Sequence, residues 1–305
     1  AVYDQEGIEV KREPSAVTWS AEDAQKGGFE HFMLKEIFEG PNAIHNTLLG
    51  ALDLIENGEV LPRIDFPSVK LVACGSSFHA AMVGKYAMEE FAGVPTTLEL
   101  ASEYRYSPGA CEAPLVILIT QSGETADTLA AAREARRRGC RTLAVTNIVG
   151  STITREVDEV LYTRAGPEIG VAATKTFLTQ LLAMYLLAIR VGYGNGTLSH
   201  DSMRSALSSL RQSSNMVQSV LNHIHDIEEA SRMVDKAVHC FFIGRNINYP
   251  TMMEGALKLK EISYIHAEGF AAGELKHGPL ALLDSSTPVI AVAIKGDHTY
   301  EKMLA

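Results

Sequence analysis

The stretch LVILITQSGETADTL, residues 115–129, sets the architecture of the chain. It opens with an unbroken run of Leu and β-branched residues, Leu115–Ile119, and passes through the polar turn 120–125 into a segment with helical character, 126–138. A short continuous apolar run bounded by turn residues is typical of a strand buried on both faces. The stretch therefore predicts a strand, a turn and a helix, in that order.

The same order occurs once before this stretch. A buried strand at 71–73 leads into Cys74-Gly75-Ser76-Ser77 and a helix over 78–91, and a third strand is expected at 141–146. Strands that alternate with helices indicate a mostly parallel sheet covered on both faces. We therefore predict a doubly wound α/β fold, whose ligand sites lie beyond the carboxyl ends of the strands.

A weaker repeat follows in the second half of the chain. After a polar, helical segment at 198–234, a strand at 238–243 is followed by Gly244 as the first strand is followed by Gly75, at an offset of about 170 residues. A strand at 289–294 corresponds to 115–119, but nothing corresponds to 141–189. We predict a connector at 1–41, one domain at 42–195, and a related, incomplete domain at 196–305.

Composition excludes several classes of protein. A net charge of −10 over 305 residues argues against a nucleic-acid partner, since such binding depends on clustered cations. The longest apolar stretch, 177–189, is too short and too polar for a bilayer span and predicts a buried helix. No signal peptide opens the chain, so we expect a cytoplasmic protein. The four cysteines are widely spaced, and we expect neither a disulfide nor a zinc site.

Hydroxyl side chains gather at the two predicted strand-to-helix turns. Free backbone N–H groups and helix dipoles attract anions at such turns. Because both turns lack Lys and Arg, and neither a P-loop nor GxGxxG is present, many neutral donors fit a sugar monophosphate better than a nucleotide triphosphate. The alternative is that these residues are only helix N-caps. The residues concerned are Ser76, Ser77, Gln121, Ser122 and Thr125.

A second group of polar residues lies on one predicted helix. Glu254, Lys258 and Glu261 fall on one helical face within two turns. A carboxylate beside a C–H bond and a cation at the developing oxyanion are what proton transfer between adjacent sugar carbons requires. The alternative is a solvated salt-bridge face. His277, in a turn, is a further candidate for proton transfer near neutral pH, although a histidine in a turn is often merely solvated.

Longer motifs indicate a family. The chain resembles the isomerase part of the glutamine:fructose-6-phosphate aminotransferases, which contains two sugar-isomerase domains, over essentially its whole length. The matching motifs are KGGFEHFMLKEIF (26–38), QSGETADTL (121–129), GPEIGVAATK (166–175) and nearly all of 254–280. The resemblance favours catalysis over a mere salt-bridge face on the helix of Glu254.

The resemblance implies a role for each matching residue. Glu261 would move the proton between C1 and C2, Lys258 would assist, and His277 would open the sugar ring from the neighbouring subunit. Glu254 would be another active-site carboxylate. The hydroxyl-rich turns would hold the phosphate, with Cys74, Gly75 and Val171 lining the sugar. Ser76 and Thr120 stand where the family usually has Thr and Ser, and both keep a hydroxyl.

The expected activity is interconversion of ketose and aldose phosphates around fructose 6-phosphate and glucosamine 6-phosphate, for hexosamine biosynthesis. No metal or organic cofactor is expected, and a site shared between subunits implies a homodimer. The family's glutaminase domain precedes the connector and its C-terminal tail supplies a catalytic Lys, so glutamine hydrolysis is expected to be absent from this chain and the site to be incomplete. The alternatives are a sugar-phosphate deaminase or deglycase, which would lack the connector motif at 26–38, and a non-catalytic sugar-phosphate sensor, which could dispense with Glu261 and His277.

Overall fold

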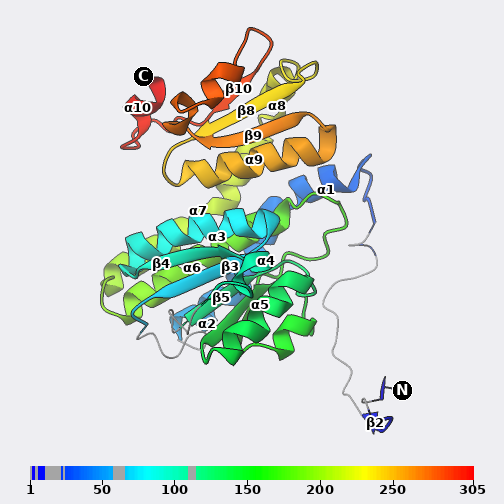
Figure 1. The fold of residues 1–305 in the computed structure, drawn as a ribbon, viewed down its shortest axis with the longest axis vertical. Coiled ribbons are helices and arrows are strands. Elements are labelled where there is room, and N and C mark those ends of the chain that lie inside the picture. Colours follow the sequence, from blue (N-terminus) through cyan, green and yellow to red (C-terminus); the bar gives the residue numbers. More distant parts are fainter. Residues whose placement is uncertain (1, 4–5, 11–21, 23–24, 58–65, 109–114) are drawn as a thin grey trace.

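The structure is a computed structural model that describes residues 2–3, 6–10, 22, 25–57, 66–108 and 115–305. Two parallel sheets, one of five strands and one of three, form its framework (Figure 1). A small antiparallel hairpin of β1 (Val2–Tyr3) and β2 (Glu9–Val10) lies apart from both sheets near the N-terminus. The fold is therefore α/β, as predicted.

The larger sheet has the strand order β4-β3-β5-β6-β7, and all four pairings are parallel. The register aligns Ala73 at the end of β3 with Ile119 at the end of β5. The two polar turns that follow these strands therefore leave the sheet side by side. The strands are β3 (Val69–Ala73), β4 (Thr96–Leu100), β5 (Leu115–Ile119), β6 (Arg141–Thr146) and β7 (Glu159–Tyr162).

Helices cover both faces of this sheet, because alternate strand residues point to opposite sides. Leu115, Ile117 and Ile119 of β5 belong to a core shared with α2 (Gly40–Glu56), α6 (Lys175–Gly194) and α7 (His200–Leu221). Val116 and Leu118 belong to a second core with α4 (Ala101–Tyr104) and α5 (Ala126–Arg137). All five β5 residues are fully buried, which confirms the interpretation of the apolar run.

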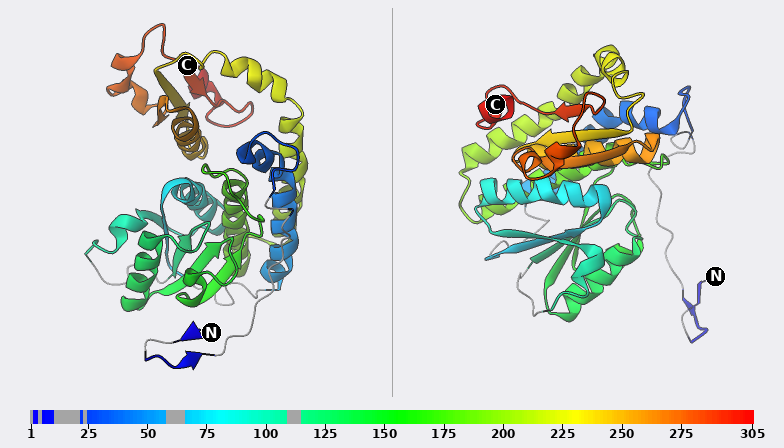
Figure 2. Two further views of the ribbon diagram at one scale, coloured as in Figure 1. Left: turned by 90° about the vertical axis from the view of Figure 1, so that its right-hand side faces the viewer. Right: turned by 45° about the horizontal axis from the view of Figure 1, so that its top comes forward.

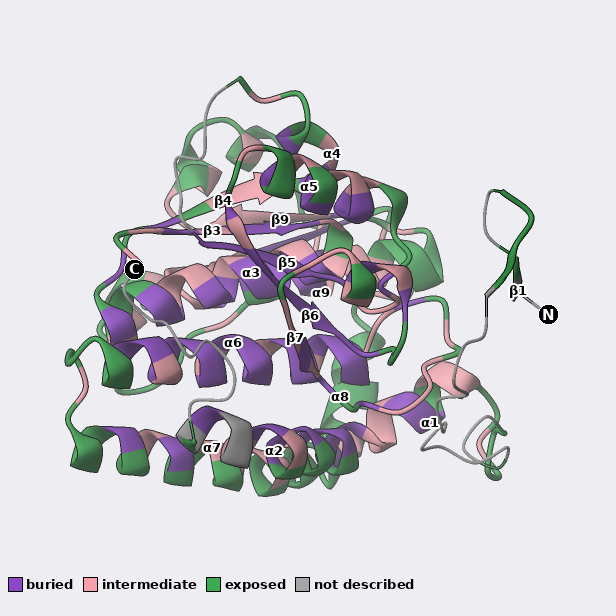
Figure 3. Cartoon of the chain, turned by 90° about the horizontal axis from the view of Figure 1, so that it is seen from below, coloured by how far each residue is buried: buried purple, intermediate pink, exposed green. Residues whose placement is uncertain are grey.

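Helix α6 is the most deeply buried long helix of this core (Figure 3). It is longer than the apolar stretch predicted, and its length and hydropathy alone would allow a membrane span. However, 67% of the most apolar 18-residue segment of α6 is buried inside the protein. The helix packs against α2 and α3 (Gly75–Ala87). A core helix accounts for the apolar composition.

Two helices carry the chain to the second sheet. The predicted helical segment at 198–234 is divided into α7 and α8 (Ile224–Ser231), and Ser199 caps α7 by accepting the N–H of Ser202. The second sheet has the order β10-β8-β9, again parallel. Its elements are β8 (His239–Gly244), α9 (Asn248–Ser263), β9 (His266–Ala271) and β10 (Val289–Ala291), with the 3-10 turns η3 (Glu274–Lys276) and η4 (Pro279–Leu282) and the terminal α10 (Tyr300–Leu304).

The internal repeat is visible in the topology. The order β4-β3-β5 in the first sheet corresponds to β9-β8-β10 in the second, with the earlier strand of each set in the centre. Strand β8 begins 170 residues after β3, and β9 begins 170 residues after β4. The predicted offset therefore reflects a repeated fold, although the proposed domain boundaries remain a prediction.

The two sheets meet through a pair of helices. Helix α9 lies over α3 (Figures 1 and 2), and the two helices are in direct contact. The first turn of α3 and the polar face of α9 are therefore neighbours, which brings the two predicted groups of site residues together.

One prediction about the cysteines is wrong. Cys74 and Cys240 are free thiols, but Cys140, which follows α5, is disulfide-bonded. Cys111 lies outside the described residues. Wide spacing along the chain therefore did not exclude a disulfide, because distance in sequence says little about distance in the fold.

Candidate active site

The first polar turn links β3 to α3. Helix α3 begins at Gly75, whose φ of +57° is a left-handed conformation that glycine adopts without strain. Cys74 occupies the N-cap position but makes no side-chain cap bond. Ser76 and Ser77 follow in the first helical turn, Ser77 almost fully buried and Ser76 only partly. Capping of α3 by a side chain therefore does not explain this turn.

The second polar turn, between β5 and α5, is held by its own hydroxyls. Buried Thr120 accepts the N–H of Gly123 at 3.3 Å, and its Oγ1 lies 3.2 Å from Oγ1 of Thr125. Ser122 accepts the N–H of Glu124 at 3.1 Å. Thr125 is the N-cap residue of α5, yet its side chain makes no cap bond. The hydroxyls thus shape a compact turn whose helix start is not capped by a side chain.

Strand β6 and the segment after it brace this turn. The carbonyl of Gln121 accepts the N–H of Asn147 at 3.1 Å, and Glu124 accepts the N–H of Thr152 at 2.7 Å. Gly123 has a φ of +68°, and a Cβ added there would lie 2.1 Å from Oγ of Ser151. Sequence reasoning did not single out Asn147 or Ser151, because their role depends on how the loop folds back.

The polar face of α9 forms a connected cluster. Nζ of Lys258 lies 2.6 Å from Oε2 of Glu261 and 3.4 Å from Oε1 of Glu254. Glu254 is 5% exposed, whereas Glu261 is exposed. The cluster therefore contains one buried carboxylate, that of Glu254, and one that solvent or a ligand can reach, that of Glu261. A face made only of solvated salt bridges would not bury Glu254.

The cluster touches the first polar turn. Ser76 donates to Oε1 of Glu254 at 2.7 Å, and Lys258 donates to Oγ of Ser76 at 3.1 Å. His79, from the second turn of α3, lies 2.7 Å from Oε2 of Glu254. Burial alone would raise the pKa of Glu254, but the hydrogen bonds from His79 and Ser76 and the charge of Lys258 outweigh it and lower the pKa. Glu254 is thus held as a carboxylate.

Two predicted residues stand apart from this cluster. His277 follows η3 and is exposed, and in the described part of the chain its side chain makes no hydrogen bond or ion pair with Lys258 or Glu261. Val171 is 99% exposed, in the loop between β7 and α6. Within one chain, therefore, the structure joins the first polar turn to α9, with the second turn beside it at the same sheet edge, but it brings neither His277 nor Val171 into the cluster.

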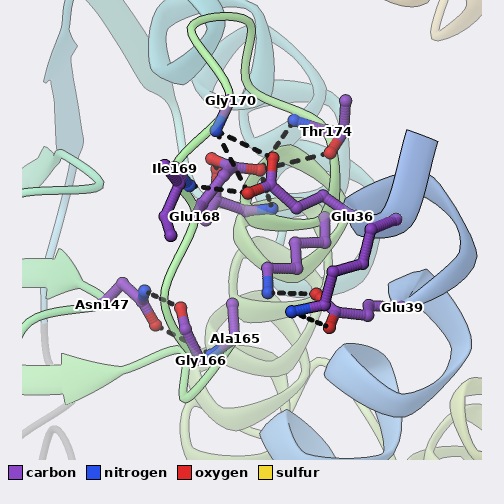
Figure 4. A network of polar contacts seen from close by, with 12 residues as sticks. Glu36, Glu39, Asn147, Ala165, Gly166, Glu168, Ile169, Gly170 and Thr174 are labelled. Atoms are coloured by element: carbon purple, nitrogen blue, oxygen red, sulfur yellow. Dashed lines mark hydrogen bonds and ion pairs between the residues drawn. The ribbon is translucent and has the colours of Figure 1, made fainter. Parts of the chain in front are cut away.

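Carboxylates anchor the loop that carries Val171, and one of them, that of Glu36, is buried (Figure 4). Glu36, 2% exposed on α1 (Phe32–Phe38), accepts the N–H of Ile169 at 2.6 Å and that of Gly170 at 3.1 Å. Glu168 accepts the N–H of Thr174 at 2.8 Å. Lys175, 3% exposed, pairs with Glu39 at 2.6 Å. The connector is thereby tied to this loop, a link that the motifs at 26–38 and 166–175 contained but did not reveal.

The chemistry of the site follows from these groups. The two turns present hydroxyls and backbone N–H groups at one sheet edge, as an anion requires, and α9 adds a cation between two carboxylates. Among the described residues, no group of three or more His, Cys, Asp and Glu side chains is arranged to hold a metal ion.

The fold and this edge define a doubly wound α/β protein with polar strand-to-helix turns at the carboxyl ends of its central strands. Comparison with known families is more specific: the SIS domain family model matches residues 65–190 and 233–305. The chain belongs to the SIS domain family. The two matched segments correspond to the two related sheets.

Relatives agree with the family resemblance found in the motifs. The chain is 51% identical over 313 residues to a glutamine--fructose-6-phosphate aminotransferase [isomerizing] of Methanosarcina acetivorans, and 47% identical over 305 residues to that of Aquifex aeolicus. Each match covers 100% of this chain and 50% of the relative, so the chain spans about half the length of these relatives. The predicted resemblance to the isomerase part is confirmed.

Solved structures show the same fold. The C-terminal domain of glucosamine-fructose-6-phosphate aminotransferase from Francisella tularensis superposes with a TM-score of 0.85 at 38% identity, over 92% of this chain and 80% of that one. A glucosamine-6-phosphate deaminase from Thermotoga maritima gives 0.71 at 24% identity, over 90% of this chain and 80% of that one, a likeness of fold alone.

Proposed function

We propose that this chain is the isomerase portion of a glucosamine-6-phosphate synthase, and that it binds fructose 6-phosphate and glucosamine 6-phosphate and interconverts ketose and aldose phosphates. The observation that carries the proposal is the meeting of the two polar groups at Ser76. This residue belongs to the hydroxyl-rich turns and yet contacts both Glu254 and Lys258 of α9. If the turns bind the phosphate of a sugar phosphate, the sugar carbons would therefore lie near the proton-transfer groups of α9.

The turns would bind the phosphate through neutral donors. Ser77, Ser122 and Thr125 supply hydroxyls, and the first turns of α3 and α5 supply backbone N–H groups and positive dipole ends. Ser76, Thr120 and Gln121 complete the set, with Thr120 holding the turn in shape. Cys74, Gly75 and Val171 would line the sugar.

The helix α9 would perform the proton transfer. Glu261 is the carboxylate of the cluster that a ligand can reach, so it would take the proton from C1 of the open-chain ketose and return it to C2. Lys258 would stabilise the negative charge that develops on the sugar oxygen in between. Glu254 keeps Lys258 in place, and His277 of a neighbouring subunit would open the ring. Because Glu261 returns to the substrate the proton that it takes up, the protein has the same charge and the same protonation state after each turnover.

The proposal includes the setting of the reaction. A site completed by His277 of another subunit makes the protein at least a homodimer, without a nucleic-acid or membrane partner and located in the cytoplasm. We assign to this chain the sugar half of the aminotransferase reaction, with imine formation at C2 where ammonia is present. The relatives' names, which belong to proteins about twice as long, support this assignment.

The test is an isomerase assay with a paired variant. Purified protein is given fructose 6-phosphate, and glucose 6-phosphate is measured alongside calorimetric binding of fructose 6-phosphate and glucosamine 6-phosphate. Glu261→Gln is expected to abolish turnover and retain binding, while Glu229→Gln, at an exposed carboxylate of α8, is expected to change neither. Binding without turnover in the parent would favour the sensor alternative. Release of ammonia from glucosamine 6-phosphate with no isomerisation would favour the deaminase, and absence of binding would reject the proposal.

A further inference from the structure

A buried histidine borders the site but has no part in the proton transfer described above. His79 lies on α3, three residues after Ser76 and so on the same face of that helix. It is 8% exposed, and its Nδ1 lies 2.7 Å from Oε2 of Glu254. A buried titratable side chain is retained only with a partner, and Glu254 is that partner.

The carboxylate of Glu254 is held at both oxygens by the same helix. His79 engages Oε2 and Ser76 engages Oε1, each at 2.7 Å. Glu254 itself belongs to α9, which starts after the second sheet has begun. Two bonds to separate oxygens fix the rotation of a carboxylate, whereas one bond would leave it free to turn. The orientation of Glu254 is therefore set by α3.

The orientation of Glu254 in turn affects Lys258. Nζ of Lys258 is close to Glu261 at 2.6 Å but more distant from Glu254 at 3.4 Å. Because Glu254 and Lys258 are four residues apart on one helix, a carboxylate released from His79 could rotate into closer pairing with Nζ. Such a rotation would draw Nζ away from Glu261 and from Ser76.

We infer that His79 is a positioning residue that, by holding Glu254 through Nδ1, keeps Lys258 at Glu261 and Ser76. The inference rests on the proposed function, since the purpose of the arrangement is proton transfer at Glu261. Nδ1 carries the hydrogen of this bond, because a carboxylate oxygen can only accept one. The bond joins the first SIS segment to the second, so the geometry of α9 depends on a side chain of α3.

The experiment compares two variants of His79 that both carry an amide N–H donor but place it one bond apart along the side chain. In His79→Asn, the amide nitrogen occupies the position of Nδ1, whereas in His79→Gln it lies one bond further out. We expect His79→Asn to retain most of kcat and His79→Gln to lose about 10- to 100-fold in kcat, with KM for fructose 6-phosphate changed less than about threefold. His225→Asn, at an exposed histidine of α8, is the control for the loss of an imidazole.

Melting temperatures and ring NMR complete the test. Equal kcat in the Asn and Gln variants, or a parallel loss of kcat and melting temperature in both, would overturn the inference. In 15N-labelled parent protein, the Nδ1 signal that disappears in His79→Asn is expected at the shift of a protonated ring nitrogen, and an unprotonated Nδ1 would also overturn it. The NMR signal can be measured without turnover, so it tests the His79–Glu254 bond even in an inactive protein. Absence of activity toward sugar phosphates in the parent would contradict the proposed function instead.

Discussion

The carboxylate of Glu36 accepts hydrogen bonds from the backbone N–H of Gly170, although the two residues are 134 positions apart. Glu36 lies on α1 in the connector, and Gly170 precedes the exposed Val171 in the loop before α6 (Figure 4). A buried carboxylate that accepts backbone N–H groups substitutes for the partners these groups would otherwise find in water. The connector thus forms part of the structure that supports the proposed sugar site.

Replacing Glu36 by Gln is expected to lower the free energy of unfolding by about 1–3 kcal/mol, because an amide NH2 replaces one carboxylate oxygen and can no longer accept a hydrogen bond from the partly buried backbone N–H groups of the loop. Urea denaturation measures the change. Glu30→Gln is the control, because Glu30 is exposed and lies on the same segment, and its effect should stay within about 0.5 kcal/mol. Equal stability of the two variants would contradict a structural role for Glu36.

Gly123→Ala is expected to destabilise the protein more than Gly139→Ala. Both glycines have positive φ, +68° and +80°, so both variants bear the cost of a left-handed alanine, about 1–2 kcal/mol. Only the Cβ at 123 would collide with Ser151, while nothing lies within 4 Å at 139. We expect an additional loss of about 1–3 kcal/mol at 123, measured by thermal unfolding. Equal melting temperatures of the two variants would contradict the close packing of the turn on Ser151.

Ser122→Ala is expected to weaken fructose 6-phosphate binding by about tenfold or more. A hydrogen bond to a charged group contributes about 1.5–3 kcal/mol, and each 1.4 kcal/mol is a factor of ten. The hydroxyl also supports the turn by accepting the N–H of Glu124. Calorimetry measures the dissociation constant, with Ser208→Ala, on the exposed face of α7, as control. Unchanged affinity would remove Ser122 from the proposed phosphate site.

The stabilising effect of Glu254 is expected to depend on pH. Its pKa is lowered from 4.5 in the folded protein, so its contribution to stability is full above about pH 5 and is lost as the pH falls through the lowered pKa. The difference in melting temperature between the parent and Glu254→Gln should therefore be largest near pH 7 and shrink below pH 4.5. A difference that stays constant from pH 7 to pH 3.5 would show that the charge of Glu254 is not stabilised by His79, Ser76 and Lys258.

Local sequence patterns were sufficient for the central elements of the fold. The apolar run at β5 and the helical character of α5 can each be recognised within about a dozen residues, because a strand or helix that packs into the core carries a regular pattern of apolar residues. The edge strands β4 and β7 and the second-sheet strand β9 were not predicted. Their residues are only partly buried, so the apolar pattern that marks a central strand is weak in them.

The residues of the candidate site also fall into two groups, those that could be predicted from local sequence and those that could not. Ser76, Ser122, Glu254 and Glu261 could be found from turns, spacing and family motifs, because these features lie within one element. His79 and Glu36 could not, because each acts through a partner more than 130 residues away. A hydrogen bond forms only within about 3 Å, and whether two distant side chains come that close depends on how whole helices pack. The packing of α9 on α3, and of α1 beside the loop before α6, settled those contacts.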